Sequence, residues 1–208
     1  QQMVKGDAWN VACMMKDNPN CPVENGPDVD FGAGTILMTL PNGKDVLIAG
    51  QKNGTVYALD VDAKGALLWK TKVGRGGIQG GVHFGMAIDG NRIYAPISDM
   101  ADEHDGRPKD GAPQPGLNAL DATTGKLLWS TPANNVCGKL EFCDPGISAA
   151  VTAIPGAVFA GHMDGRFRAY DGATGKVLFE YDAKQEVVTV SGQRAKGGSF
   201  GGGGPAVR

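Results

Sequence analysis

VLIAGQKNGTVYALDVDAKGALLWKTKV, residues 46–73, is the stretch of sequence that decides the fold. It contains an apolar run, a glycine turn, a second run that ends in Ala-x-Asp, another glycine turn, and a third run that ends near an aromatic residue. The same order recurs in AVFAGHMDGRFRAYDGATGKVLFEYDA (157–183), and in a unit that begins at RIYAPISD (92–99) and resumes at GLNALDATTGKLLWSTP (116–132). A period of roughly 50 residues predicts a repeat architecture built from one structural unit.

Four anchor positions recur in these units, and the physical roles of three of them can be named. An Asp in a tight turn accepts hydrogen bonds from the turn amides. A Gly at the following turn supplies the positive φ that reverses the chain. The aromatic side chain has enough area to wedge between neighbouring sheets. The anchors are Ala58, Asp60, Gly65 and Trp69, then Ala119, Asp121, Gly125 and Trp129, then Ala169, Asp171, Gly175 and Phe179.

A segment rich in small residues precedes each unit: FGAGTILMTL (31–40), GVHFGMAI (81–88) and ISAAVTAI (147–154). We expect each to be the innermost strand of its unit, because small side chains suit the crowded axis of a radial array. Four antiparallel strands in each repeat predict an all-β fold, a β-propeller of about three to four blades.

The chain is expected to be one partial propeller domain, 1–208, that requires the remainder of the propeller as its partner, because a closed propeller needs at least about four blades. An acidic insertion at 99–115 interrupts the second unit. It is expected to be an exposed loop, because it mixes Gly, Pro and charges of both signs. The expected parts are the end of an earlier blade and a loop at 1–29, blades at 30–73, 81–132 and 146–183, the insertion at 99–115, and the start of a next blade at 197–208.

The composition and the absence of certain motifs argue against several functions. The 20 Lys and Arg against 22 Asp and Glu give a net charge of −2 without a clustered basic surface, so a nucleic-acid partner is not expected. No apolar run reaches the length of a membrane span. The Ser and His residues lack the context of a hydrolytic triad. GSFGGGG (198–204) has no following GK[ST], so a phosphate-binding loop is not expected.

The four cysteines fall into two close pairs, Cys13 with Cys21 and Cys137 with Cys143. Sequence alone permits three pairings, of which proximity favours the two local disulfides. A zinc site is the alternative, although neither pair has Cys-x-x-Cys spacing or a nearby His. Disulfides indicate an oxidising compartment, so a periplasmic or secreted location is expected. No Cys-x-x-Cys-His occurs, so this chain is not expected to attach a c-type haem.

ALDATTGKLLW (119–129) resembles the tryptophan-docking motif of the alcohol dehydrogenases that use pyrroloquinoline quinone (PQQ), a family of eight-bladed propellers. QQMVKGDAWNVACMM (1–15) and AGQKNGTVYALD (49–60) also resemble segments of that family. Together with GRGGIQGGVHFGM (74–86) and the cysteine loop, they are most similar to its polyvinyl alcohol dehydrogenase branch. The resemblance implies oxidation of alcohols, including secondary alcohols of a polymer such as polyvinyl alcohol, with electrons passed to cytochrome c.

The resemblance also implies PQQ beside Ca²⁺, with an Asp as general base. Asp7 matches the first acid of the family pattern, and Asn10 occupies the position of the usual catalytic Asp. Both are candidate catalytic residues and candidate calcium ligands, since an amide oxygen can bind calcium. An amide cannot accept the proton, so either Asp7 is the base or the base lies elsewhere.

Lys52 matches the basic residue that contacts the quinone oxygens in the family. Ser98 and Asp99 lie near the position that contacts the ring from the next blade. The tryptophan that many relatives place beneath the quinone is not evident near 146–150. The remaining calcium ligands of the family, a Glu and an Asn, would lie upstream of residue 1.

Two functions therefore remain open at the level of sequence. The first is the PQQ-dependent dehydrogenase. The second is a cofactor-free propeller that binds protein partners, in which Asp7 would be a turn or capping acid and Lys52 a solvated hairpin residue. His83 lies on a predicted inner strand and could face the central channel, although a structural role for it is the simpler hypothesis.

Overall fold

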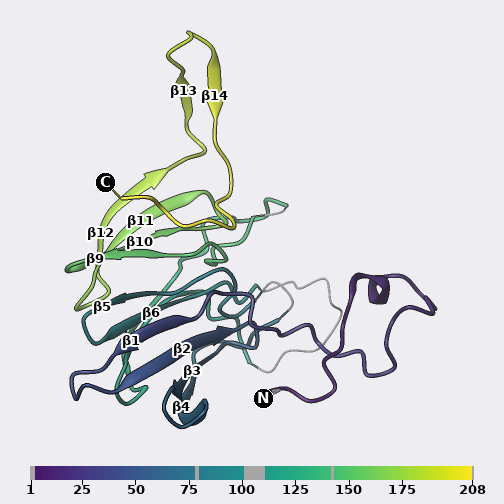
Figure 1. The fold of residues 1–208 in the computed structure, drawn as a ribbon. Helices are drawn as coiled ribbons and strands as arrows, with labels where there is room; N and C mark the ends of the chain where they lie inside the picture. Colours follow the sequence, from purple (N-terminus) through teal and green to yellow (C-terminus); the bar gives the residue numbers. More distant parts are fainter. Residues whose placement is uncertain (1–2, 78–79, 101–110, 142, 208) are drawn as a thin grey trace.

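The computed structural model describes residues 3–77, 80–100, 111–141 and 143–207. Three four-stranded antiparallel sheets follow one another along the chain and stand side by side, and a two-stranded hairpin projects away from them (Figure 1). The prediction of an all-β fold with blades of four antiparallel strands is confirmed. The central part of the predicted insertion, 101–110, lies outside the described residues, as do 1–2 and 78–79 of the family-like motifs.

The strands run in chain order across each sheet, so each blade is a simple meander. The first blade comprises β1 (Ile36–Thr39), β2 (Asp45–Gln51), β3 (Thr55–Asp60) and β4 (Ala66–Lys72). The second comprises β5 (Ala87–Asp89), β6 (Arg92–Ile97), β7 (Gly116–Asp121) and β8 (Leu127–Pro132). The third comprises β9 (Thr152–Ile154), β10 (Ala157–Gly161), β11 (Arg166–Asp171) and β12 (Val177–Asp182).

The innermost strands are shorter than their small-residue segments predict. β5 begins only at Ala87 and β9 only at Thr152. The backbone before them pairs with the neighbouring blade instead: Val82 N donates to Gln51 O (3.3 Å), and Ile147 N donates to Ile97 O (3.1 Å). These first halves therefore link one blade to the next.

The predicted turn chemistry is confirmed. The carboxylate of Asp121 accepts hydrogen bonds from the backbone N–H and the hydroxyl of Thr124, both at 2.8 Å. Asp171 makes the same two bonds with Thr174. The glycines that follow have positive φ, +71° at Gly125 and +72° at Gly175, where a residue with a Cβ would be strained.

The tryptophans join the blades, as the repeat predicts. Trp69 Nε1 donates to Ala122 O of the second blade (3.0 Å), and Trp129 Nε1 donates to Gly172 O of the third (3.1 Å). A Cβ on Gly125 would lie 2.5 Å from the Trp69 ring, so the indole packs where only glycine fits. Phe179 has the same position in the third blade, where its side chain is 53% exposed.

The apolar core lies between the sheets in two clusters. Ile48, Val56 and Ile93 are central to the cluster between the first and second blades. Leu117, Ile147 and Val158 are central to the cluster between the second and third. Each interface thus buries aliphatic side chains beneath a peripheral tryptophan.

The hairpin of β13 (Glu186–Val188) and β14 (Arg194–Lys196) was not anticipated from the sequence. After it, the chain returns to the third blade, where Phe200 N donates to His162 O (3.1 Å) and Thr152 Oγ1 donates to Pro205 O (2.6 Å). The assignment of 197–208 to the start of a next blade, and the other domain boundaries, stay predictions.

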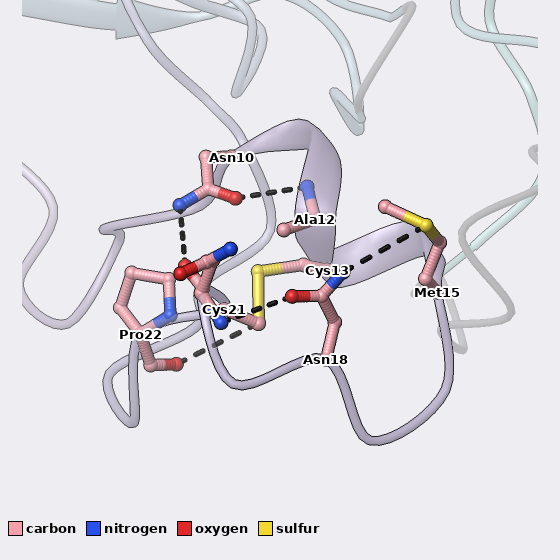
Figure 2. Close-up of a disulfide and its surroundings, with 8 residues drawn as sticks. Asn10, Ala12, Cys13, Met15, Asn18, Cys21 and Pro22 are labelled. Atoms are coloured by element: carbon pink, nitrogen blue, oxygen red, sulfur yellow. Dashed lines mark hydrogen bonds between the residues drawn. A yellow bond between two sulfur atoms is a disulfide. The ribbon is translucent and has the colours of Figure 1, made fainter.

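Both local disulfides are present, Cys13–Cys21 and Cys137–Cys143. Because they use all four cysteines, the alternative zinc site is excluded. The first disulfide joins Cys13, which lies in the 3-10 helix η1 (Val11–Met14), to Cys21 (Figure 2).

A buried histidine in the third blade predicts a pH-dependent stability. His162 is fully buried between Pro145 O and the Tyr170 hydroxyl, each 2.8 Å from a ring nitrogen. Burial, reinforced by the nearby Arg168 charge, lowers the pKa of His162 to about 3. Between pH of about 6.5 and about 3, the unfolded chain binds a proton at this histidine and the folded chain does not. The contribution of His162 to the free energy of unfolding should therefore be fully present above pH of about 6.5. It should fall toward pH of about 3, by up to about 1.4 kcal/mol per pH unit.

Urea unfolding of the full-length protein between pH 7 and pH 4 would measure this loss. His162→Gln is the control, because Gln51 occupies the equivalent position in the first blade and accepts a hydrogen bond from Tyr57 (2.8 Å). The stability difference between wild type and this variant should shrink as the pH falls. A difference that stays constant with pH would contradict the prediction.

Candidate functional site

Lys52 lies at the turn that joins β2 to β3, and it is only 6% exposed. Its ammonium bridges two carboxylates, Asp28 (2.9 Å) and Asp30 (3.0 Å). Burial alone would lower the pKa of Lys52, but its hydrogen bonds and charge interactions with Asp28 and Asp30 outweigh this and raise it. The ammonium is therefore a fixed positive charge near the start of the inner segment of the first blade.

The two acidic partners of Lys52 differ in exposure. The Asp28 side chain is 16% exposed, whereas the Asp30 side chain is 65% exposed. Asp30 O also accepts a hydrogen bond from Lys52 N (3.0 Å), which ties this loop to the blade. Asp30 thus presents an accessible carboxylate beside a buried cation.

Asp7 binds the backbone of the loop that carries Asp28 and Asp30. Its two carboxylate oxygens accept hydrogen bonds from the backbone N–H groups of Asp28 and Val29, both at 2.8 Å. Asp28 has a φ of +58°, so the loop follows a conformation that needs such support. The structure therefore brings Asp7 to the backbone of Lys52's partners, with both of its oxygens engaged.

Asn10 caps η1, just before the loop closed by the disulfide. Its side-chain oxygen accepts from Ala12 N (2.9 Å) and its amide donates to Asn20 O (3.0 Å) (Figure 2). These bonds join Asn10 to residues in or next to the loop closed by Cys13 and Cys21, and neither bond involves Lys52. The catalytic and metal roles of Asp7 and Asn10 stay predictions.

Replacing Asp7 with alanine should lower the free energy of unfolding by about 2 kcal/mol, because two partly buried N–H groups would lose their charged acceptor. Asn10→Ala should cost about 1 kcal/mol, the usual value for a lost cap. Urea unfolding of the two full-length variants would compare them. Equal losses would contradict the supporting role of Asp7.

Ser98 and Asp99 follow β6 at the same end of the second blade, and both are fully buried. The Asp99 carboxylate pairs with Arg75 (3.1 Å) and accepts from Gln114 N (2.7 Å). Arg75 also donates to Met100 O at 2.8 Å. Asp99 therefore holds the base of the insertion, and the predicted cofactor contacts of Ser98 and Asp99 are not tested by these bonds.

His83 and Ser148 lie on the inner segments of the second and third blades and meet across them. His83 Nδ1 lies 2.8 Å from Ser148 Oγ. Burial lowers the pKa of His83, as does the charge of Lys52, against a smaller opposing effect of Asp30 and Asp28. The imidazole is thus neutral and electrostatically coupled to the Lys52 cluster.

A family model with the description "Outer membrane protein assembly factor BamB" and the family name PQQ_2 matches residues 52–199. The chain belongs to this family of PQQ-type propellers. The resemblance read from the repeat and its motifs is confirmed.

Two curated relatives are similar along almost the whole chain. A polyvinylalcohol dehydrogenase from Pseudomonas sp is 41% identical over 214 residues, which covers 99% of this chain and 31% of the relative. A polyvinylalcohol dehydrogenase from Sphingopyxis sp. (strain 113P3) is 39% identical over 212 residues, covering 99% of this chain and 32% of the relative. The chain thus spans about a third of the length of these relatives.

Solved structures support the propeller fold. The quinohemoprotein alcohol dehydrogenase ADHIIG from Pseudomonas putida HK5 is 21% identical with a TM-score of 0.54, covering 77% of this chain and 22% of that one. A europium-containing methanol dehydrogenase is 19% identical with a TM-score of 0.55, covering 84% of this chain and 40% of that one. At these identities the likeness shows the fold.

The residues around Lys52 fit part of a binding site for PQQ. Lys52 is a buried, protonated donor, which suits the oxygens of an anionic quinone. Among the described residues, no group of three or more His, Cys, Asp or Glu side chains is placed to hold a metal ion.

Sequence reasoning missed Asp28 and Asp30, the residues that contact Lys52. A signal was present, since Asp28-Val29-Asp30 directly precedes the first small-residue segment, FGAG. The similarity of GDAWN to a family pattern predicts Asp7 and Asn10 as site residues instead.

Proposed function

We propose that the full-length protein oxidises alcohols with PQQ. The observation that carries this proposal is the buried Lys52 ammonium between Asp28 and Asp30, in a chain that is 41% identical to a polyvinylalcohol dehydrogenase. A cofactor-free scaffold would not need a buried cation beside an accessible carboxylate, since such a group is costly to bury.

Lys52 would bind the quinone oxygens through its ammonium. When bound, PQQ supplies the two-electron acceptor for alcohol oxidation. Asp28 keeps Lys52 charged and oriented, and Asp7 fixes the loop that carries Asp28. Ser98 and Asp99, at the equivalent end of the next blade, are proposed to lie near the ring.

Asp30 is proposed as the general base. Its carboxylate is 65% exposed and 3.0 Å from Lys52 Nζ, so it can meet a substrate hydroxyl at the edge of the quinone site. Asp7 is less suited to this role, because backbone N–H groups occupy both of its oxygens.

The finer features follow from the relatives and remain proposals. They are secondary alcohols of a polymer such as polyvinyl alcohol as substrates, cytochrome c as electron acceptor, a periplasmic or secreted location, and Ca²⁺ beside the quinone. Asp7 and Asn10 are proposed to contribute oxygen ligands to calcium. The two disulfides support an oxidising compartment.

Titration of the full-length protein with PQQ, followed by dye-linked alcohol oxidation, tests the proposal. Lys52→Met should raise the Kd for PQQ about a hundredfold, because a charged hydrogen bond to the quinone is lost. Lys70→Met is the matched control, since Lys70 lies on an exposed face of β4. Absence of saturable PQQ binding by a folded wild type would leave the scaffold function instead.

A further inference from the structure

The β13–β14 hairpin rises from the same end of the blades as Lys52. Its base is tied to the turn between β10 and β11, because Ala183 N donates to Gly165 O (3.0 Å) and Gly197 N donates to Ala183 O (2.8 Å). This turn joins the second and third strands of its blade, as the turn at Lys52 does in the first blade. From there the hairpin projects away from the three sheets (Figure 1), so it extends from the end of the blades that carries the candidate site.

One face of the hairpin is basic. In the antiparallel register Glu186 lies opposite Lys196 and Val188 lies opposite Arg194, so these four side chains share a face. Arg194 pairs with Glu186 (2.6 Å), and no ion pair of Lys196 occurs among the described residues. Counting Lys184 at its base, the hairpin has three basic residues and one acidic residue. It is therefore a positive element in a chain whose net charge is −2.

Apolar side chains are exposed beside these charges. Val188 is 73% exposed, and Val190, in the turn that follows β13, is fully exposed. Thr189 N donates to Gln193 O (2.8 Å), which closes the turn and holds both valines near the tip. β13 and β14 form a separate two-stranded sheet, and such a hairpin is marginally stable in water by itself. A projecting hairpin with exposed valines and a basic face is typical of a surface that binds a partner.

The chemistry of the proposed function requires a partner at this end of the blades. Oxidation of one alcohol to its carbonyl releases two electrons and two protons. The protons pass to solvent, whereas the electrons need an acceptor that approaches the site. A protein that accepts one electron at a time docks twice for each alcohol oxidised, so it has to bind weakly and leave quickly. A small interface with an apolar centre and complementary charges meets this need, since charge steers the encounter without making it tight.

We propose that the β13–β14 hairpin is the docking surface for an acidic protein that accepts one electron at a time. Lys184 and Lys196 attract the acidic rim of this acceptor, and Val188 and Val190 contact the apolar surface around its redox centre. Each of two oxidised acceptor molecules gains one electron, and both protons go to solvent. The inference rests on the proposed dehydrogenase function and names the charge of its partner and the surface that binds it.

The test compares a small dye with a protein as electron acceptor of the PQQ-loaded full-length protein. The protein probe is an acidic c-type cytochrome, and a basic c-type cytochrome is the reference. The double variant Lys184→Glu, Lys196→Glu should lower kcat/KM for the acidic cytochrome about tenfold at low ionic strength, because attraction becomes repulsion. The loss should shrink as salt screens these charges. Dye-linked alcohol oxidation should stay within about twofold of wild type, since the variant leaves the Lys52 cluster intact.

The double variant Lys126→Glu, Lys176→Glu is the matched control, since both lysines are exposed in turns at the opposite end of the blades. It changes the net charge equally and should leave kcat/KM for the acidic cytochrome within about twofold of wild type. Val188→Ser should raise the KM for this cytochrome about threefold at any salt concentration, because it removes an apolar contact. As a readout without turnover, calorimetry should give the hairpin double variant a Kd for the oxidised acidic cytochrome about tenfold above that of the control.

Three results would overturn the inference. They are an equal loss of activity with dye and with cytochrome, a wild type that prefers the basic cytochrome, and hairpin variants whose Kd equals that of the control. A wild type that oxidises alcohols with the dye while showing any of these results would keep the proposed function and lose only the docking surface. If wild type oxidises no alcohol even with the dye, the proposed function itself fails and the inference falls with it.

Discussion

Replacing Trp129 by alanine is expected to lower the free energy of unfolding of the full-length protein by about 3 kcal/mol. The indole packs over Gly175, where a Cβ would lie 2.5 Å from the ring, and its Nε1 donates to Gly172 O at 3.1 Å. Truncation removes both contacts between the second and third blades and leaves a gap at their periphery. Urea unfolding followed by intrinsic fluorescence and circular dichroism would measure the change.

Two controls separate the contributions. Trp129→Phe keeps an aromatic ring in the interface but loses the N–H donor. It should therefore lower the free energy of unfolding by about 1 kcal/mol beyond the cost of exchanging one aromatic ring for another. Val190→Ala, at a fully exposed position, should change stability by less than about 0.5 kcal/mol. A Trp129→Ala variant as stable as Val190→Ala would show that the docking tryptophan does not hold the blades together.

The repeat could be predicted because its anchors act locally. Asp121 needs only the N–H and hydroxyl of Thr124, and Gly125 needs only a positive φ, so a short stretch of sequence carries the whole turn. The tryptophan contact is longer in range, but it recurs between equivalent positions of neighbouring blades. Once the period was recognised, the interface between blades followed from it.

The candidate site could be predicted only in part, because it depends on a loop outside the repeat. Lys52 was identified from its similarity to a family position. Its partners, Asp28 and Asp30, belong to a loop whose backbone Asp7 binds and in which Asp28 has a φ of +58°. No periodic pattern encodes that conformation, and so local similarity alone directed the prediction to Asp7 and Asn10.

The choice between Asp30 and Asp7 as the base gives the prediction with the largest effect on activity. Asp30→Asn should lower kcat for alcohol oxidation by about a thousandfold, because the amide keeps the shape of the carboxylate but cannot accept the proton. The Kd for PQQ should change by less than about threefold, since Asp28 still holds Lys52. Anaerobic stopped-flow measurement of quinone reduction by 2-pentanol would give the rate without electron transfer to an acceptor.

Asp7→Asn is the isosteric control, and the two candidates predict opposite rankings. If Asp7 only supports the loop, its amide still accepts one of the two backbone N–H groups, and the variant should lose stability while keeping quinone reduction within about tenfold of wild type. If Asp7 is the base, Asp7→Asn should be nearly inactive and Asp30→Asn active. That second ranking would overturn the assignment of Asp30, because an accessible carboxylate beside Lys52 would then have no part in proton abstraction.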